Sequence, residues 1–130
     1  MAGRRHQDIF ARDIVWSRGT EQGIAYARFR IDDDDPHAPS IVLSRFEPGA
    51  RVPTHTHDTN YFEYIIDGEQ TVGKTRFAKG DVRIAMAGAG YGPIVVGPEG
   101  CTVLIVFADG SQAMTVPMPR AKAAGSGVQG

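Results

Sequence analysis

Glycine and proline repeatedly interrupt the sequence, and this punctuation limits what the chain can fold into. The 130 residues include 16 glycines and 8 prolines, which fall between short runs rich in Val, Ile, Phe, Tyr and Thr. Runs of this kind are typical of β-strands joined by turns. No window in the middle of the chain has the 3.6-residue apolar period of a helix. The sequence therefore predicts an all-β protein, built as a sandwich or a barrel.

The predicted strands are short, and recognisable turn signals separate them. Asp67-Gly68 has the composition of a hairpin turn, and residues 78–81 and 97–100 are also expected to turn. The run 101–107 is apolar on both faces, which indicates a strand buried in the middle of the fold. We expect strands at 23–31, 40–46, 51–57, 61–66, 70–77, 82–86, 94–96 and 101–107.

Composition and charge exclude several classes of protein. The net charge is -1, with 42% apolar and 22% charged residues, so nothing indicates bulk attraction to nucleic acid or membranes. Cys101 is the only cysteine, so an intrachain disulfide is impossible. There is no apolar run of bilayer length and no apolar core of a secretory signal. We expect a cytoplasmic protein with one domain, 9–118, between a flexible N-terminus, 1–8, and a disordered tail, 119–130.

Two histidines one residue apart are the first candidates for a functional site. Side chains alternate between the two faces of a strand, so His55 and His57 point to the same side. Tyr61 and Glu63 have the same relation on the next predicted strand. If both strands turn these faces inward, four polar groups meet in one cavity. Two neutral imidazoles and a nearby oxygen donor suit a divalent transition metal.

The spacing of these histidines and of the nearby glycines resembles that of the cupin family. The first cupin motif runs glycine, five residues, His-x-His, three or four residues, glutamate, six residues and glycine. The second runs glycine, five residues, proline-x-glycine, two residues and histidine. The residues that match are Gly49, His55, His57, Gly68, Gly80 and Gly88. The similarity covers residues 40–107 and implies a double-stranded β-helix, the jelly-roll barrel of cupins.

The chain departs from the family at half of the usual metal ligands. Most cupin enzymes hold a metal with three histidines and one glutamate. Here Tyr61 stands at the glutamate position, Tyr91 stands at the position of the last histidine, and Met86 replaces the proline. The resemblance implies a divalent transition metal, such as iron, manganese, nickel or zinc, with a metal-free site as the alternative.

Three arrangements of this site are open from the sequence. In the first, Glu63 joins His55 and His57 as the third ligand of a metal. In the second, Tyr61 or Tyr91 completes the site as a phenolate or acts as a general base beside the metal. In the third, no metal binds, and the same side chains form a hydrogen-bonded pocket for a small organic ligand.

Arginines supply the positive charge that such a pocket requires. A carboxylate inside a barrel needs a partner, so Glu63 would pair with Arg45 or Arg51 if it does not bind a metal. Arg83 and Arg45 are the candidates for binding a substrate, because a guanidinium holds a carboxylate through two hydrogen bonds. Cys101 is expected to be a small buried residue rather than a nucleophile, because no base partner is apparent.

Together these features predict a metal-dependent cupin enzyme that acts on a small oxygen-bearing organic molecule. The reaction would be isomerisation, elimination, decarboxylation or dioxygenation. The predicted metal ligands are His55, His57 and Glu63, and the predicted catalytic residues are Tyr61 and Tyr91. The alternative is a non-catalytic module that binds a small molecule without metal. Because cupins commonly pair, we also expect a homodimer in which the N-terminal strands, 9–31, lie against a second subunit.

Overall fold

The computed structural model of the protein describes residues 6–19, 23–113 and 116–117. Residues 1–5 of the predicted flexible N-terminus and the whole predicted tail, 119–130, lie outside the described residues. The elements are η1 (Ala11–Asp13), β1 (Ser17–Arg18), β2 (Ile24–Arg30), β3 (Ser40–Phe46), β4 (Arg51–Val52), β5 (His55–Thr56), β6 (Tyr61–Val72), β7 (Thr75–Ala78), β8 (Val82–Ala85), β9 (Ile94–Phe107), η2 (Gly110–Gln112) and β10 (Val116–Pro117).

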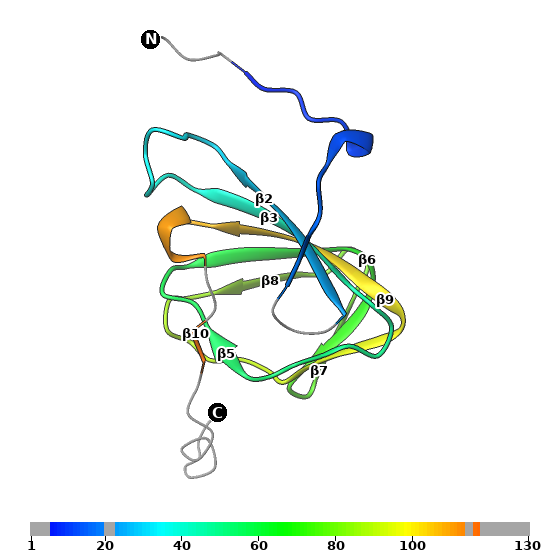
Figure 1. The fold of residues 1–130 in the computed structure, drawn as a ribbon. Helices are drawn as coiled ribbons and strands as arrows, with labels where there is room; N and C mark the ends of the chain where they lie inside the picture. The colour runs from blue at the N-terminus through cyan, green and yellow to red at the C-terminus, as the bar shows by residue number, and fades with distance from the viewer. Residues whose placement is uncertain (1–5, 20–22, 114–115, 118–130) are drawn as a thin grey trace.

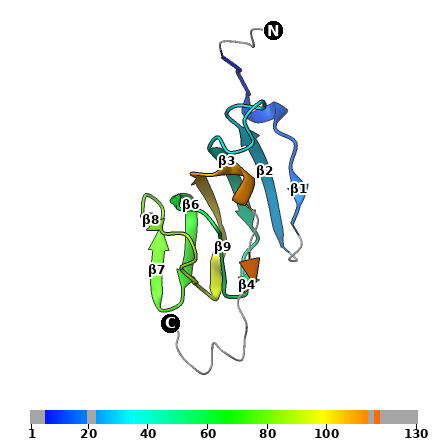
Figure 2. The same cartoon turned by 90° about the vertical axis from the view of Figure 1, so that its left-hand side faces the viewer.

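The strands form an eight-stranded antiparallel sheet and a two-stranded one (Figure 1). The larger sheet has the order β1-β2-β3-β9-β6-β7, with β8 also paired to β6 and β4 also paired to β9, and the smaller sheet pairs β10 with β5. Figure 2 shows β8, β6, β9, β3 and β2 next to one another. The helices of the described residues are short 3-10 turns, which confirms the predicted all-β class, and neither is long and apolar enough to cross a membrane.

Strand β9 lies at the centre of the larger sheet. Its second half pairs with β3 on one side and with β6 on the other. Both neighbours cover its edges, so the run 101–107 lies in the middle of the sheet, as its composition predicts. Its burial is incomplete: Cys101, Val103 and Phe107 are buried, and the residues between them are only half-buried. The buried core consists of Val52, Ile65, Val72, Ile94, Val96, Cys101 and Val103. Cys101 is buried among these residues, as expected.

The predicted hairpin at Asp67-Gly68 is wrong, because β6 continues through both residues and they pair with β9. The predicted turn at 97–100 falls inside β9, where these residues have no partner in the ladder and the register shifts opposite Gly68 and Gln70. Gly68 has φ +79°, and a Cβ added there would lie 2.0 Å from the carbonyl oxygen of Gly100. Glycine is therefore required here because two backbones approach closely at a bulge. The chain turns instead at 73–74, inside the predicted strand 70–77.

The predicted strand 51–57 is also divided. It forms β4 and β5, which are separated at 53–54. Proline at position 53 has no amide hydrogen to donate, so it cannot continue a ladder. The division lets β4 pair with β9 while β5 pairs with β10. As a result, the histidine pair leaves the larger sheet and lies on a separate segment.

The close approach at Gly68 leads to a test of the β6–β9 ladder. Gly68→Ala should lower the free energy of unfolding by roughly 3 kcal/mol or more, because the new methyl group overlaps the Gly100 carbonyl. Gly49→Ala is the matched control, since Gly49 has a similar φ of +76° but no atom within 4 Å of an added Cβ. That change should cost only about 1–2 kcal/mol from the left-handed backbone. Equal losses in urea denaturation would contradict the close-approach argument.

Candidate functional site in the barrel

A backbone bridge brings Tyr91 beside the histidine pair. The amide of His55 donates to the carbonyl of Tyr91, and the amide of Tyr91 donates to the carbonyl of His55, each at 3.0 Å. Tyr91 lies in the glycine-rich segment before β9, where the sequence predicts a loop. The bridge joins this loop to β5 and directs the tyrosine side chain toward the imidazoles.

Both imidazoles are buried and face the hydroxyl group of Tyr91. His55 is 7% exposed and His57 is 4% exposed. The Tyr91 hydroxyl lies 2.8 Å from Nε2 of His55 and 3.4 Å from Nε2 of His57. The ring of Tyr61 lies against His57, with a centroid distance of 5.0 Å. Three of the four side chains that the sequence places on a common face therefore meet here, and Tyr91 joins them from the loop.

The hydrogen bonds of His55 determine which of its nitrogens carries the proton. Nδ1 lies 2.9 Å from the carbonyl oxygen of Pro53. A carbonyl only accepts, so Nδ1 is the donor, and in the neutral ring Nε2 has the lone pair. The Tyr91 hydroxyl then donates to Nε2. A backbone carbonyl thus holds His55 in the tautomer whose inner nitrogen can accept a proton or bind a metal.

The two phenols of the site stay protonated. Burial raises the pKa of Tyr91 well above its ordinary value of 10.0. Burial also raises the pKa of Tyr61, although the hydrogen bond with Tyr91 and the charge of Arg83 act in the opposite direction. Without a bound cation, both hydroxyl groups therefore act as hydrogen-bond donors rather than as bases.

Glu63 and Arg83 form a buried ion pair at the edge of this cluster. They are direct partners in the β6–β8 ladder, and Nη2 and Nε of Arg83 lie 2.6 and 3.1 Å from Oε1 of Glu63. The side chain of Arg83 is 14% exposed and that of Glu63 is 4% exposed. Burial acts against the charge of Arg83, but Glu63 and the nearby phenols more than offset this, and the pKa of Arg83 lies above its ordinary value. The partner of Glu63 is thus Arg83, and the predicted pairing with Arg45 or Arg51 is wrong.

Arg83 also contacts both tyrosines. Its Cζ lies 4.1 Å from the centroid of the Tyr91 ring, and its Nη1 lies 3.4 Å from the Tyr61 hydroxyl. Arg83 therefore faces the interior, which the sequence left open. Two of its nitrogens are already engaged by Glu63, so its capacity to hold a substrate carboxylate is reduced.

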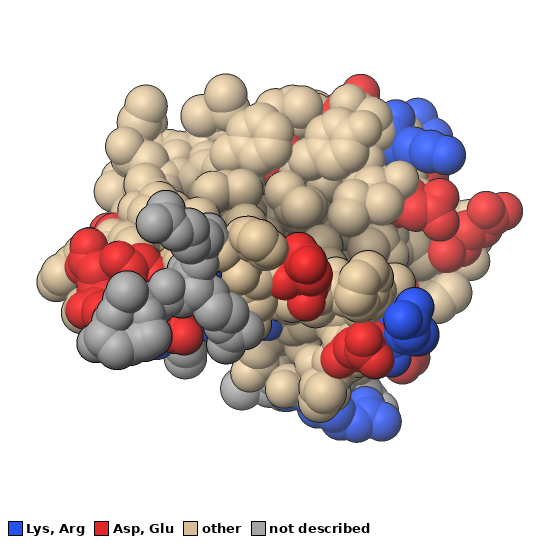
Figure 3. All heavy atoms as spheres, turned by 90° about the horizontal axis from the view of Figure 1, so that it is seen from above, with Lys and Arg blue, Asp and Glu red and all other residues tan. Residues whose placement is uncertain are grey.

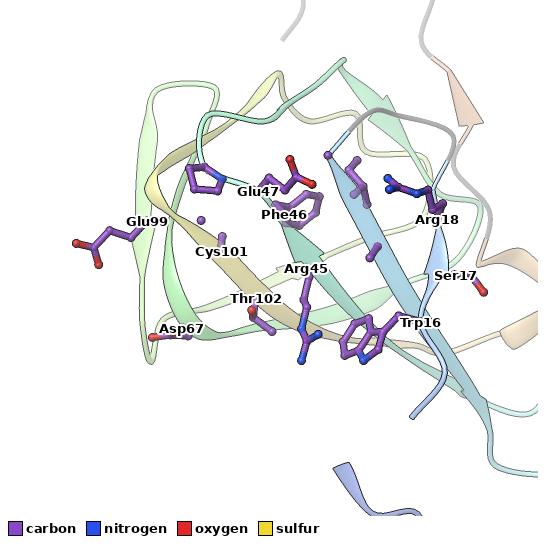
Figure 4. Close-up of a pocket in the computed structure, with 15 residues that line it drawn as sticks. Trp16, Ser17, Arg18, Arg45, Phe46, Glu47, Asp67, Glu99, Cys101 and Thr102 are labelled. Carbon is purple, nitrogen blue, oxygen red and sulfur yellow. The ribbon is translucent and has the colours of Figure 1, made fainter. Parts of the chain in front are cut away.

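Arg45 lies in a different place from the other candidates. It stacks on Trp16 with its Cζ 3.9 Å from the ring centroid, beside a groove of about 490 Å³ that is also lined by Asp67, Glu99 and Cys101. Figure 4 shows the guanidinium of Arg45 next to the Trp16 indole. The structure does not bring Arg45 together with Arg83. Arg45 lies at the groove beside Trp16, and Arg83 lies inside the barrel beside Tyr61 and Tyr91, so the two cannot bind one small substrate as predicted.

Comparison with known proteins identifies the fold. No protein-family model and no curated protein matches the sequence. The polyketide cyclase RemF from Streptomyces resistomycificus is similar over 88% of this chain and 86% of that chain, with a TM-score of 0.71 and 14% identity. An RmlC-like cupin from Shewanella frigidimarina is similar over 79% of this chain and 90% of that one, with a TM-score of 0.65 and 18% identity. This chain has the cupin fold.

A third similar structure is an enzyme with a longer chain. Oxalate decarboxylase from Bacillus subtilis matches 88% of this chain with a TM-score of 0.66 and 24% identity, and the match covers 35% of that chain. These likenesses confirm the predicted jelly-roll architecture. Since all of them lie below 25% identity, they show the fold and leave the chemistry of the site to the residues themselves.

The residues of this site that could hold a metal form an unusual donor set. Within the described ranges, no three side chains among His, Cys, Asp and Glu are grouped to hold a metal ion, so Glu63 does not join the imidazoles in such a group. Ligands about 2.0–2.2 Å from a divalent ion lie roughly 3–3.5 Å from one another. The distances of 2.8 and 3.4 Å from the Tyr91 oxygen to the two Nε2 atoms are close to this spacing. His55, His57 and Tyr91 are therefore the residues that would hold a metal.

Sequence reasoning missed one polar residue in the cupin core. Gln70 is 1% exposed, and neither its amide nitrogen nor its amide oxygen has a hydrogen-bond partner among the described residues. A buried amide without partners is costly, by about 1–3 kcal/mol, so a water molecule or ligand beside it would be stabilised. The sequence places Gln70 in a predicted strand, but it does not show which face of that strand is buried.

The buried ion pair gives a first test of the site. Glu63→Gln keeps the shape of the side chain but leaves the charge of Arg83 unbalanced, so it should lower the free energy of unfolding by about 3–5 kcal/mol. Glu69→Gln is the control, because its partner Arg76 is exposed and exposed pairs contribute little. The double change Glu63→Leu with Arg83→Met should recover most of the loss. Denaturation curves for Glu63→Gln that match those of Glu69→Gln would contradict a buried pair.

The environment of Cys101 gives a second test. Burial, together with nearby carboxylates of which Glu63 contributes most, raises the pKa of the Cys101 thiol to about 12 from 9.0. The folded thiol should react far more slowly with a thiol reagent near neutral pH than the unfolded one. Because the folded pKa is the higher, this group's contribution to stability is present below pH 9.0 and is lost as the pH rises toward 12. Rapid labelling of the folded protein would contradict this assignment.

Proposed function

We propose that this chain is a cupin enzyme that acts on a small oxygen-bearing organic molecule at the site of His55, His57 and Tyr91, with a divalent transition metal as its cofactor. The observation that supports this most is the convergence of both buried Nε2 atoms on one phenol oxygen. The interior of a small barrel holds one small ligand, which limits the size of the substrate. The reaction would be of the isomerase, lyase, decarboxylase or dioxygenase type.

The similar structures agree with an enzymatic role. They include a polyketide cyclase and an oxalate decarboxylase, and the latter is described with Mn(II) centres. When bound, a divalent metal would polarise an oxygen of the substrate or bind dioxygen. Manganese, iron, nickel and zinc all accept imidazole and oxygen ligands, so the donor set does not choose among them.

The residues around the donor set would bind the substrate and control its protons. Tyr61 is held by Arg83 at 3.4 Å and keeps its proton, so it would donate a hydrogen bond to an oxygen of the substrate or give up a proton as an acid. The pair of Arg83 and Glu63 fixes the position of this phenol and leaves the site close to neutral. Phe107, in ring contact with both His57 and Tyr61, excludes water from this side.

A second candidate function is a small-molecule-binding module that uses the same pocket without metal. The ion pair between Glu63 and Arg83 favours it, because the carboxylate predicted as the third metal ligand already has a partner. In this case the Tyr91 hydroxyl stays hydrogen-bonded to His55, and the pocket binds its ligand through the hydroxyl of Tyr61.

Metal content separates the two functions. Protein purified without an affinity tag should hold close to one divalent metal per chain, measured by elemental analysis after reconstitution and gel filtration. His55→Ala and His57→Ala should each lose it, because a site of three donors is reduced to two. His37→Ala is the matched control, since His37 is exposed and pairs with Asp109 away from the barrel. Tyr91→Phe should retain less metal than the wild type.

The opposite result is equally informative. A wild-type protein that stays free of metal after reconstitution would overturn metal dependence and support the binding module. Metal retained by Tyr91→Phe but lost on Glu63→Gln would overturn Tyr91 as the third donor and restore Glu63, the ligand predicted from the sequence. A cytoplasmic location and the absence of nucleic-acid or membrane partners stay predictions.

A further inference from the structure

One carboxylate and one cation account for the charge in the interior of the described chain. Glu63 is the only buried Asp or Glu of residues 6–19, 23–113 and 116–117, and every Lys and Arg of these ranges except Arg83 is exposed. Figure 3 shows charged side chains of both signs projecting from the surface instead. A charge that a ligand brings into the barrel must therefore be balanced by this pair or by a bound metal.

Glu63 occupies the edge of the Arg83 guanidinium that would otherwise hold a ligand carboxylate. Nε and Nη2 lie along one edge of the guanidinium, and both donate to Oε1 of Glu63, at 3.1 and 2.6 Å. A guanidinium binds a carboxylate most firmly through two N–H groups on one edge. Glu63 reaches this edge from the directly opposite position of the β6–β8 ladder. A ligand carboxylate would have to displace Glu63, and the displaced carboxylate would then be buried without a partner.

The two tyrosines of the site cover other parts of the same guanidinium. Nη1 of Arg83 donates to the hydroxyl of Tyr61 at 3.4 Å, and the ring of Tyr91 lies 4.1 Å from Cζ. The Tyr61 hydroxyl keeps its own proton, because burial raises its pKa. The pair of Glu63 and Arg83 therefore presents a neutral phenol to the site rather than a free cation.

An anionic group of a ligand beside Tyr61 would be a buried charge without a counter-ion. Removing such a charge from water costs far more than removing a neutral oxygen. A hydroxyl, carbonyl or amide oxygen can instead accept a hydrogen bond from the phenol, with no charge to balance. The rings of Tyr61 and Phe107, whose centroids are 5.5 Å apart, add apolar surface beside this donor. This combination suits an uncharged carbon skeleton that carries a polar oxygen.

We propose that the pair of Glu63 and Arg83 makes this site selective for substrates that carry an uncharged oxygen, and not a carboxylate or phosphate, where they lie against Tyr61. The inference rests on the proposed function in placing the substrate at this site. It holds with or without a metal, because a metal would bind a different oxygen of the substrate. Ketones, alcohols, phenols and amides belong to the accepted class. Glu63 is then a specificity-determining residue, and Arg83 positions Tyr61 instead of binding a substrate carboxylate as the sequence suggests.

Matched amides and carboxylates test this selectivity on the full chain after treatment with a chelator. The probes are 4-fluorobenzamide with 4-fluorobenzoate, and trifluoroacetamide with trifluoroacetate, because each pair differs mainly in charge and fluorine NMR detects weak binding. The wild type should bind at least one amide about tenfold or more tightly than its carboxylate. Tyr61→Phe should weaken the binding of that amide. Equal or tighter binding of the carboxylates, or no binding of either amide, would overturn the proposal.

Glu63→Gln should reverse the preference, because it leaves the edge of Arg83 open to another carboxylate. Its affinity for the carboxylate probes should rise by about tenfold or more, and these probes should raise its melting temperature. Glu69→Gln is the matched control, because it removes the same charge from an exposed pair with Arg76 and should keep the wild-type preference. A Glu63→Gln variant that folds and gains no carboxylate binding would contradict the role of Glu63.

The double change Glu63→Leu with Arg83→Met keeps the test decisive if Glu63→Gln does not fold. It removes both charges, so it should still reject the carboxylates. Carboxylate binding that is present in the wild type and lost in the double variant would show that Arg83 holds carboxylates, and would overturn the proposal.

These results are distinguishable from the metal analysis. A wild type that prefers the amides but stays free of metal after reconstitution would support the selectivity and overturn metal dependence. A wild type that holds a metal when reconstituted but prefers the carboxylates when metal-free would overturn the selectivity and leave metal dependence in place.

Discussion

The ladder between β6 and β9 is the interaction on which the rest of this protein depends. These are the two longest strands of the described chain, and each exchanges its outer neighbours along its length. The first part of β6 pairs with β8 and the second part with β7, while β9 pairs first with β4 and later with β3. The register shifts near Gly68 allow the ladder to bend without ending. The pair β6–β9 thereby connects the part of the sheet that contains β3 and β8 with the part that contains β4 and β7.

Neighbouring residues of the ladder also face two different environments, a polar interior and an apolar exterior. Inward from β6 come Tyr61 and Glu63, and outward come Phe62 and Tyr64. Inside, the charge of Glu63 is balanced by Arg83 on β8, which holds the two phenols near the imidazoles. Outside, the same two strands carry the exposed apolar side chains of Phe62, Tyr64, Val82 and Ile84. Because the side-chain period of a strand is two residues, a register slip of one residue would exchange these environments and destroy both.

The donor set differs from the usual cupin set in charge as well as in identity. Two tyrosines stand where the family has a carboxylate and an imidazole, and the remaining carboxylate is neutralised by an arginine. A metal at His55, His57 and Tyr91 would have to displace the proton of the Tyr91 hydroxyl. This is costly because burial raises the pKa of Tyr91. Such a site would release a proton on metal binding, whereas an imidazole that is already neutral binds without that cost. The protonated form of the same site is a hydrogen-bonding pocket, which is why both candidate functions follow from one arrangement.

The sequence by itself determined the all-β class, the inward parity of Tyr61 and Glu63, and the region of the cupin motif, because these depend on local period and spacing. It also indicated the central position of the run 101–107 and the burial of Cys101. Only the tertiary structure decided that Glu63 pairs with Arg83, that Arg45 stacks on Trp16 instead, and that Tyr91 meets His55, since each contact joins segments far apart in the chain. The same reason explains the wrong hairpin at Asp67-Gly68. A glycine needed for a turn and a glycine needed where two backbones nearly touch are identical in sequence, and only the position of Gly100 distinguishes them.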